Sequence, residues 1–190
     1  LIINASFAPD VLEVVQKYTT FNGINLEIIP HKGGLTDKEA IASRLEQGDV
    51  AGVIVPQPNY FGLIENYEAY AELCHSKKAL LVINAVASTL GILKSPGELG
   101  ADIACGDAQS LGIPLSFGGP YIGYLCVKKE HVRKMPGRLV GATVDSEGKR
   151  CFVLTLQARE QHIRREKATS NICTAQGVMC LYIAMYLSLM

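Results

Sequence analysis

Short apolar runs alternate with stretches of helical periodicity along most of the sequence, and this alternation restricts the fold more than any other feature. The runs occupy residues 1–3, 26–29, 50–55, 80–83, 101–105 and 121–127. Runs without regular polar positions are typical of strands covered on both faces of a parallel sheet. Because helical patterns separate several of them, we predict an α/β fold with a mainly parallel sheet flanked by helices.

Signals for helix ends place the first two helices. Pro9 suits a first helical turn, and periodic apolar residues follow it until Gly23 ends the helix. Thr36 and Glu39 have the spacing of a capping box, in which each side chain satisfies a backbone N–H at the other residue. Two later helices are predicted at residues 65–76 and 174–190.

The pattern changes after residue 128. Residues 135–149 are rich in Gly, Pro and charge and predict a surface loop, whereas residues 151–156 predict a strand. No internal repeat is present. We expect residues 1–190 to form one incomplete domain, cut at both ends, because the sequence starts without Met and ends within an apolar run.

Charge and cysteine spacing argue against several classes of function. Lys plus Arg equals Asp plus Glu, so no global charge favours nucleic acid or an anionic membrane. The apolar stretch at 177–190 is shorter than the roughly 20 residues of a spanning helix, so we expect it to pack on a neighbouring molecule or on the rest of its domain. The six cysteines include no C-x-x-C pair and fit reduced thiols in a cytoplasmic protein.

Small polar side chains follow three of the predicted strands. Asn59, Asn84 and Asp107 each come just beyond an apolar run. In parallel α/β sheets, ligands bind at this edge. Each side chain could instead cap the turn or helix that follows it. The residues alone leave both alternatives open.

A glycine-rich segment lies at residues 117–123. The backbone N–H groups of Gly118 and Gly119 could approach a phosphate. The segment matches neither of the two common nucleotide-binding glycine motifs. A tight turn into the next strand is the favoured alternative.

The most polar stretch covers residues 159–171. On a helix, Arg164 and Arg165 would share one side, and Arg159 and His162 would share another. This cluster of cations is a candidate anion or partner site. A solvated helix face with Glu–Arg pairs is the alternative.

Several blocks of the sequence resemble signatures of the glycine cleavage system P-protein family. The blocks are REQHIRREKATSNICTAQ at 159–176, GDAQSLGIPLSFGGPYIG at 106–123, MPGRLVG at 135–141 and PQPNYFGLIE at 56–65. Their order and spacing are similar to the first subunit of the two-subunit bacterial form, and the resemblance covers essentially the whole chain.

The resemblance implies a fold, an activity and partners. The implied fold is aspartate-aminotransferase-like (PLP fold type I), with this chain as a truncated large domain. The implied assembly is a heterotetrameric glycine dehydrogenase (decarboxylating), an oxidoreductase that decarboxylates glycine on pyridoxal phosphate and passes the aminomethyl group to the lipoyl arm of the H-protein. A homologous second subunit would hold the pyridoxal phosphate. No nucleic acid, membrane or metal is implied.

The resemblance also indicates which cofactor partners are missing. A pyridoxal phosphate enzyme needs a lysine for the internal Schiff base and an acid beside the pyridine nitrogen. The pattern places Asn84, which is neutral, at the acid position, and residues 107–112, where the lysine is expected, contain none. No lysine occurs between Lys94 and Lys128. We therefore expect no Schiff base on this chain.

By the same resemblance, some positions are expected either to be degenerate cofactor-binding positions or to contact a cofactor across a subunit interface. These positions are Asn59, Asn84, Gly118 and Gly119. The expected interface or anion-binding residues are Arg159, His162, Arg164 and Arg165. No catalytic residue is assigned. The leading interpretation is a subunit that supports a catalytic partner; the alternatives are a self-sufficient enzyme using Lys94 or Lys128, and a non-catalytic α/β binding domain.

Overall fold

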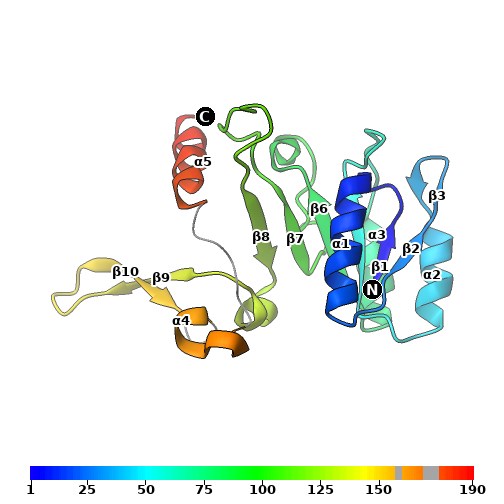
Figure 1. Cartoon of the computed structure of the whole chain (residues 1–190), viewed down its shortest axis with the longest axis horizontal. Coiled ribbons are helices and arrows are strands. Elements are labelled where there is room, and N and C mark those ends of the chain that lie inside the picture. Colours follow the sequence, from blue (N-terminus) through cyan, green and yellow to red (C-terminus); the bar gives the residue numbers. More distant parts are fainter. Residues whose placement is uncertain (157–159, 169–175) are drawn as a thin grey trace. The chain divides into compact units, whose positions relative to one another are not determined.

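The computed structural model describes residues 1–156, 160–168 and 176–190, and its internal contacts divide the chain into two compact units. The first unit comprises Leu1–Cys126 and Val178–Met190, and the second comprises Val127–Gly177. Figure 1 shows the elements of both units. This division does not decide whether the units belong to one domain, so the expected single incomplete domain stays a prediction.

The first unit is built on a six-stranded sheet in the order β2-β1-β5-β6-β7-β8 (Figure 1). Its strands are β1 (Ile2–Asn4), β2 (Glu27–Ile29), β5 (Gly52–Gln57), β6 (Leu80–Ala85), β7 (Ile103–Asp107) and β8 (Gly123–Val127). The first five of these strands pair in parallel, which confirms the predicted mainly parallel sheet. From β1 the chain adds β2 on one side, whereas from β5 it adds β6, β7 and β8 on the other side. The direction of strand addition therefore reverses between β1 and β5.

The last strand, β8, runs back along β7. Ala108 N donates to Ile122 O at 2.9 Å, so the connecting loop leaves and re-enters the sheet at the same edge. Gly123 begins β8 beside Gly106, near the end of β7. This geometry makes β8 antiparallel to β7.

Helices cover both faces of the sheet. They are α1 (Pro9–Phe21), α2 (Lys38–Glu46), α3 (Glu68–Ser76) and α5 (Gly177–Leu189), with a 3-10 turn η1 (Ala87–Gly91) after β6. The helix α1 lies on the face opposite α3 (Figure 1). It starts at the predicted Pro9, and Gly23 follows its end at φ +66°, a conformation that glycine adopts without strain.

The predicted capping box at Thr36 is wrong. Asp37 is the N-cap of α2, and its carboxylate accepts from Ala40 N at 3.0 Å. Thr36 instead belongs to the short hairpin of β3 (His31–Lys32) and β4 (Leu35–Thr36). Its N–H donates to Glu65 Oε2 at 2.7 Å. Glu65 is therefore held outside α3, which begins three residues later than the sequence pattern predicted.

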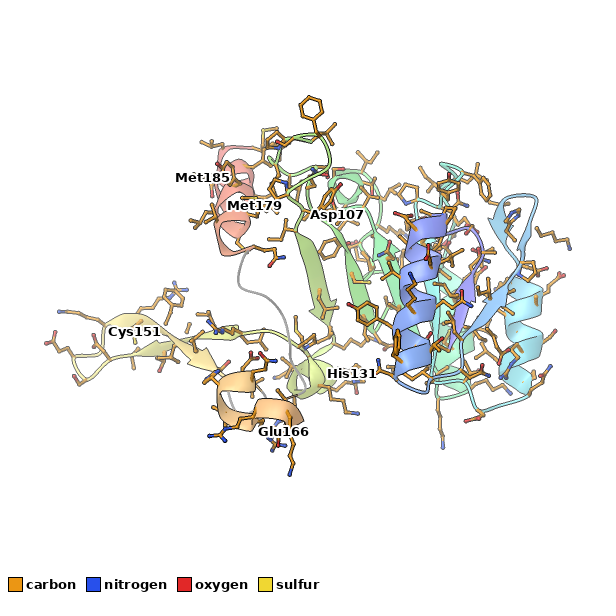
Figure 2. All side chains as sticks on the ribbon, in the orientation of Figure 1. Asp107, His131, Cys151, Glu166, Met179 and Met185 are labelled. Atoms are coloured by element: carbon orange, nitrogen blue, oxygen red, sulfur yellow. The ribbon has the colours of Figure 1, made fainter. Side chains whose placement is uncertain are left out.

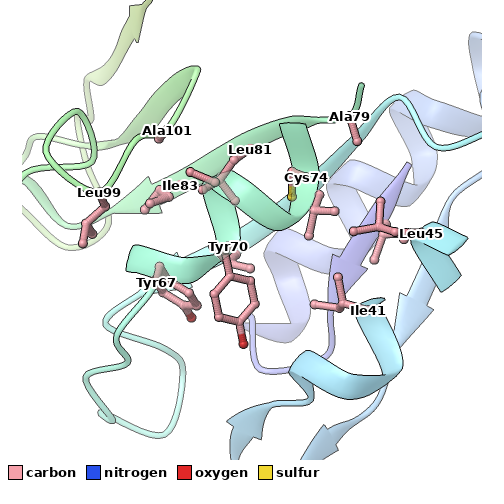
Figure 3. Close-up of a cluster of buried hydrophobic side chains, with 14 of the residues drawn as sticks. Ile41, Leu45, Tyr67, Tyr70, Cys74, Ala79, Leu81, Ile83, Leu99 and Ala101 are labelled. Atoms are coloured by element: carbon pink, nitrogen blue, oxygen red, sulfur yellow. The ribbon is translucent and has the colours of Figure 1, made fainter. Parts of the chain in front are cut away.

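One face of the sheet packs against α2 and α3 to form the main core. Alternate side chains of β6, Leu81 and Ile83, point into this core, and the Tyr67 and Tyr70 rings meet edge to face at 5.1 Å (Figure 3). The other face of β6 is only half-buried. The prediction that this strand is covered on both faces therefore holds for one face alone within the described residues.

The apolar helix α5 packs on the first unit along one stripe. Met179 and Ile183 lie against a small cluster of Ala108, Ile113 and Ile122, so the expected packing on the rest of the domain is confirmed. The remaining sides of α5 are exposed and apolar, with Leu181 as an example. In the described part of the chain, no helix combines the length and the apolar character that crossing a bilayer requires.

The second unit contains an antiparallel hairpin of β9 (Leu139–Val144) and β10 (Arg150–Thr155). The strand predicted at residues 151–156 is confirmed, but the loop predicted at residues 135–149 is wrong, because β9 occupies its centre. Val140 and Val144 favour a strand, and pairing with β10 outweighs the Gly, Pro and charge around them.

The charged stretch at 159–171 does not form one helix over its described part. Besides the 3-10 turn η2 (Lys129–Lys134), the second unit has α4 (Gln161–Arg164) and the 3-10 turn η4 (Arg165–Lys167). Arg165 has φ +52°, which ends α4 after a single turn. The predicted grouping of Arg164 and Arg165 on one helix side is therefore wrong. Arg159 lies outside the described residues.

An ion pair between β2 and α2 generates a prediction about acid stability. The Arg44 guanidinium donates to both Glu27 carboxylate oxygens at 2.6 Å and holds the pKa of Glu27 below its usual value. A lowered pKa stabilises the folded chain above about pH 4.5 and loses this effect as the pH falls through the folded-state value. We expect Glu27→Gln to lower the urea midpoint modestly at pH 7, with a smaller difference from the unmodified chain at pH 3. Glu13→Gln, in an exposed helical pair, is the control; a Glu27→Gln effect that is the same at both pH values would contradict the prediction.

Candidate functional site

The carboxyl ends of β5, β6 and β7 lie at one edge of the sheet, where the sequence places the candidate polar residues. The register aligns Pro56 with Asn84 and Asn84 with Cys105. Val86 N donates to Gln57 O at 3.0 Å and joins the ends of β5 and β6. Figure 2 shows Asp107 at the end of β7 on the same edge. The parallel register thus gathers the strand ends as expected, and the bonds of each side chain decide what it can do there.

Asn59 is buried, with 6% exposure, and all of its amide hydrogen-bonding groups are occupied. Its Nδ2 donates to Gly34 O at 2.8 Å and to Glu65 Oε1 at 3.0 Å. Its Oδ1 accepts from Phe61 N and Leu63 N, both at 3.0 Å. Asn59 therefore fixes the loop after β5 on the β3–β4 hairpin. Its contact with a cofactor stays a prediction.

A polar network around Glu65 extends from Asn59, and the sequence pattern did not reveal it. The half-buried Glu65 carboxylate accepts from Thr36 N and Thr36 Oγ1, and the Gln57 side chain bonds the backbone of Glu65 in both directions. Tyr67 is fully buried, donates to Pro56 O at 2.9 Å and has a pKa raised mainly by burial. The signal that the sequence offered was Gln57 and Asn59 directly after an apolar run.

Asn84 faces the neighbouring strand. Its Nδ2 lies 3.7 Å from Cys105 Sγ, a weak hydrogen bond, and burial raises the pKa of the Cys105 thiol. Tyr124, from β8, donates to Ala85 O at 2.7 Å, and burial raises its pKa to about 12. Gly106 allows this packing, because a Cβ there would lie 2.0 Å from Ala85 O. These groups are neutral near pH 7, so no charge develops beside Asn84 from them.

Asp107 and Gln109 shape the turn after β7. The Asp107 carboxylate accepts from Gln109 N at 2.8 Å, which is the capping alternative that the sequence left open. Gln109 is buried and its amide donates to Pro114 O at 3.3 Å. Asp107 itself is exposed, so one side of its carboxylate faces solvent.

The glycine-rich segment forms a tight turn. Gly118 and Gly119 have φ +116° and +143°, in a region where other residues are strained. Both of their N–H groups donate to Leu115 O at 3.0 Å, so neither points freely at a phosphate. The favoured alternative of a tight turn is thus borne out in its geometry. Phe117 at its tip is fully exposed.

The residues at this edge do not fit a covalently held pyridoxal phosphate. Asn84 occupies the position where the resemblance expects an acid, and it bonds to a thiol. Residues 95–127 contain no lysine. Lys94 is exposed and forms an ion pair with Glu68, which raises the pKa of the Lys94 amine through that hydrogen bond and favours the protonated, non-nucleophilic form.

Comparison with known proteins gives a consistent result. The model of the family described as "Glycine cleavage system P-protein" matches residues 1–190. A probable glycine dehydrogenase (decarboxylating) subunit 1 from Desulforamulus reducens is 51% identical over 189 residues, which cover 100% of this chain and 42% of that protein. The protein of the same description from Geobacillus thermodenitrificans is 50% identical over 188 residues, covering 99% and 42%. The chain thus spans about two fifths of the length of these curated relatives.

Solved structures confirm the predicted aspartate-aminotransferase-like fold. The crystal structure of a glycine decarboxylase (P-protein) of the glycine cleavage system, in inhibitor-bound form, superposes with a TM-score of 0.92 at 46% identity, covering 99% of this chain and 42% of that chain. A ureidoglycine–glyoxylate aminotransferase from Bacillus subtilis gives a TM-score of 0.58 at 15% identity, covering 98% and 46%. This second similarity concerns the fold alone.

The bonds of Asn59 predict a large effect of its removal. Asn59→Ala leaves Gly34 O, Phe61 N and Leu63 N without their partner, so we expect a loss of about 2–4 kcal/mol in the free energy of unfolding. Asn59→Asp should destabilise at pH 7, because a second carboxylate would adjoin Glu65, and should recover below about pH 5, where one carboxyl binds a proton. Urea unfolding measures both. The exposed Asn25→Ala is the control, and equal effects of the two alanine variants would contradict the prediction.

Proposed function

Since the chain belongs to the glycine cleavage system P-protein family, we propose that it is part of the first subunit of a glycine dehydrogenase (decarboxylating) and supports catalysis by a partner subunit. One observation supports the proposal that a partner subunit performs the chemistry. Residues 95–127 contain no lysine, and the neutral Asn84 stands where the resemblance expects an acid. Transimination, by which an amino acid enters such an enzyme, requires that lysine.

The proposed assembly has defined partners. A second P-protein subunit holds the pyridoxal phosphate, which supplies an electron sink when glycine loses carbon dioxide. The lipoyl arm of the H-protein receives the aminomethyl group, and the site of action is the cytoplasm. Two relatives that are 51% and 50% identical to this chain are described as subunit 1 of a glycine dehydrogenase (decarboxylating). Their description supports the two-subunit form.

This chain's own residues have a positioning role in the proposal. Asn59, through its four side-chain bonds, holds the loop after β5 in place at the edge. The turn at Gly118 and Gly119, with the exposed Phe117 at its tip, is proposed to lie at the subunit interface near the partner's cofactor phosphate. Asn84 is proposed to occupy a cofactor-binding position of the family at which the expected acid is replaced by a neutral amide. His162, Arg164 and Arg165 are proposed as interface or anion-binding residues, together with Arg159.

Reconstitution tests this function. We expect the full-length first subunit to show no glycine decarboxylation alone and to restore activity when mixed with the second subunit, lipoylated H-protein, glycine and pyridoxal phosphate. Release of labelled carbon dioxide from carboxyl-labelled glycine measures the reaction, and omission of each protein in turn is the control. Full activity of the first subunit without its partner would refute the supporting role, and no activity of the complete mixture would refute the proposed function.

The absence of a Schiff base can be tested separately. We expect that incubation of the subunit with pyridoxal phosphate, followed by borohydride reduction, gives sparse labelling over exposed lysines such as Lys17, Lys32 and Lys77. Mass spectrometry of peptides locates the reduced adducts. The second subunit, treated in parallel, is the positive control with one dominant site. Near-stoichiometric labelling of Lys94 or Lys128 would overturn the expectation.

A further inference from the structure

The sequence contains a single Asn–Gly step, and the proposed function does not use it. Asn22 alone among the asparagines precedes a glycine. The pair lies at the end of α1, where Asn22 is the C-cap and Gly23 follows at φ +66°. Both residues are exposed, and a Cβ at Gly23 would meet no atom of the described chain within 4 Å. Glycine has no side chain to shield its backbone nitrogen, so that nitrogen can reach the adjacent Asn22 amide when the backbone rotates.

These two groups can react with each other and then with water. The Gly23 nitrogen, on loss of its proton, attacks Cγ of Asn22. A C–N bond forms, and the bond from Cγ to Nδ2 breaks as ammonia leaves with that electron pair and a proton. The product is a cyclic succinimide. Water then opens the ring at Cγ to give aspartate, or at the backbone carbonyl to give isoaspartate, so the net change converts an amide and water into a carboxylic acid and ammonia.

Hydrogen bonds at the end of α1 hold both reacting groups in the folded chain. Asn22 Nδ2 donates to Tyr18 O at 2.8 Å, and Gly23 N donates to Thr20 O at 3.1 Å. The group that must leave and the nitrogen that must attack are thus both engaged. Helix ends open at a small cost compared with global unfolding. The reaction therefore proceeds from molecules in which the last turn of α1 is open.

The product weakens the same helix end. A carboxylate at residue 22 cannot donate to Tyr18 O, so this carbonyl group loses its side-chain donor. The new negative charge lies at the negative end of the helix dipole, and the last turn of α1 contains no basic residue to offset it. Isoaspartate also lengthens the backbone between α1 and β2 by one methylene group. Either product favours further opening of the turn.

We propose that Asn22 is a deamidation site of the folded subunit, which reacts when the last turn of α1 opens and, once modified, loosens the connection from α1 to β2. Every other asparagine precedes a residue whose side chain crowds the attacking nitrogen; Asn25, for example, precedes Leu26. Exposure and the following glycine together distinguish Asn22. This inference concerns the fold of the chain and depends neither on the partner subunit nor on catalysis.

Mass spectrometry of the full-length subunit tests the site. The chain offers an internal control, because trypsin cleaves after Lys17 and Lys32 and so releases Asn22 and Asn25 on one peptide. Both asparagines are exposed. After incubation of the folded subunit in mildly alkaline buffer, we expect aspartate and isoaspartate to accumulate at Asn22 while Asn25 stays an amide. Equal conversion of the two residues, or no conversion of Asn22 in the folded subunit, would overturn the proposal.

A comparison of the folded subunit with the subunit unfolded in guanidinium chloride tests the role of the helix end. We expect Asn22 to react roughly tenfold more slowly in the folded subunit, which corresponds to an opening cost of about 1.4 kcal/mol at a helix terminus. Asn25 serves as the reference in both states. Equal rates at Asn22 in the two states would show that the bonds at the end of α1 do not limit the reaction and would overturn that part of the proposal.

Hydrogen exchange tests the loosening. We expect Asn22→Asp, which reproduces one product, to speed exchange of the Gly23 and Ile24 N–H groups roughly tenfold, because it removes a hydrogen bond and adds a charge that the helix dipole disfavours. Asn25→Asp places the same charge beyond the last turn and is the matched control, with unchanged exchange at both groups. Circular dichroism checks that each variant folds. Unchanged exchange in Asn22→Asp would refute the loosening, even where Asn22 is modified.

Discussion

The packing of alternate β5 and β6 side chains against α2 and α3 is the constraint on which the first unit depends. Val53 and Val55 from β5 join Leu81 and Ile83 from β6 in one core, and Tyr67 closes it near the loop after β5. Parallel strands need such helical cover, because their pairing alone leaves apolar faces in water. The strand register and the helical cover together place the polar residues at the carboxyl ends of β5, β6 and β7 along one edge of the sheet.

Hydrogen bonds made within the chain occupy many of the polar groups at that edge, although one side of the Asp107 carboxylate faces solvent. Asn59 and Glu65 bond to the β3–β4 hairpin and the loop around it, Asn84 bonds to Cys105, and the N–H groups of Gly118 and Gly119 turn towards Leu115. A site whose polar groups satisfy one another is rigid but has little capacity left for a ligand. This arrangement suits a subunit that shapes an interface while its partner performs the chemistry.

The second unit has the opposite character. Among the described residues, its hairpin packs few side chains and leaves apolar residues such as Phe152 exposed. It belongs to a segment with a net charge of +6. The apolar helix α5 shows the same feature in the first unit, since Leu181 and Met185 are exposed opposite the packed stripe. Large apolar side chains in solvent are the usual sign of surfaces that become buried in an assembly.

The sequence by itself determined the mainly parallel α/β fold, the Pro9 start of α1 and the missing lysine, because apolar runs, proline geometry and residue identity are local properties. Only the tertiary structure decided that Thr36 bonds Glu65 instead of capping α2, since its partner lies 29 residues away. It likewise decided that β9 forms where Gly, Pro and charge predicted a loop, because a strand needs its pairing partner. The bond from Asn59 to Gly34, 25 residues earlier in the chain, is likewise visible only in the tertiary structure.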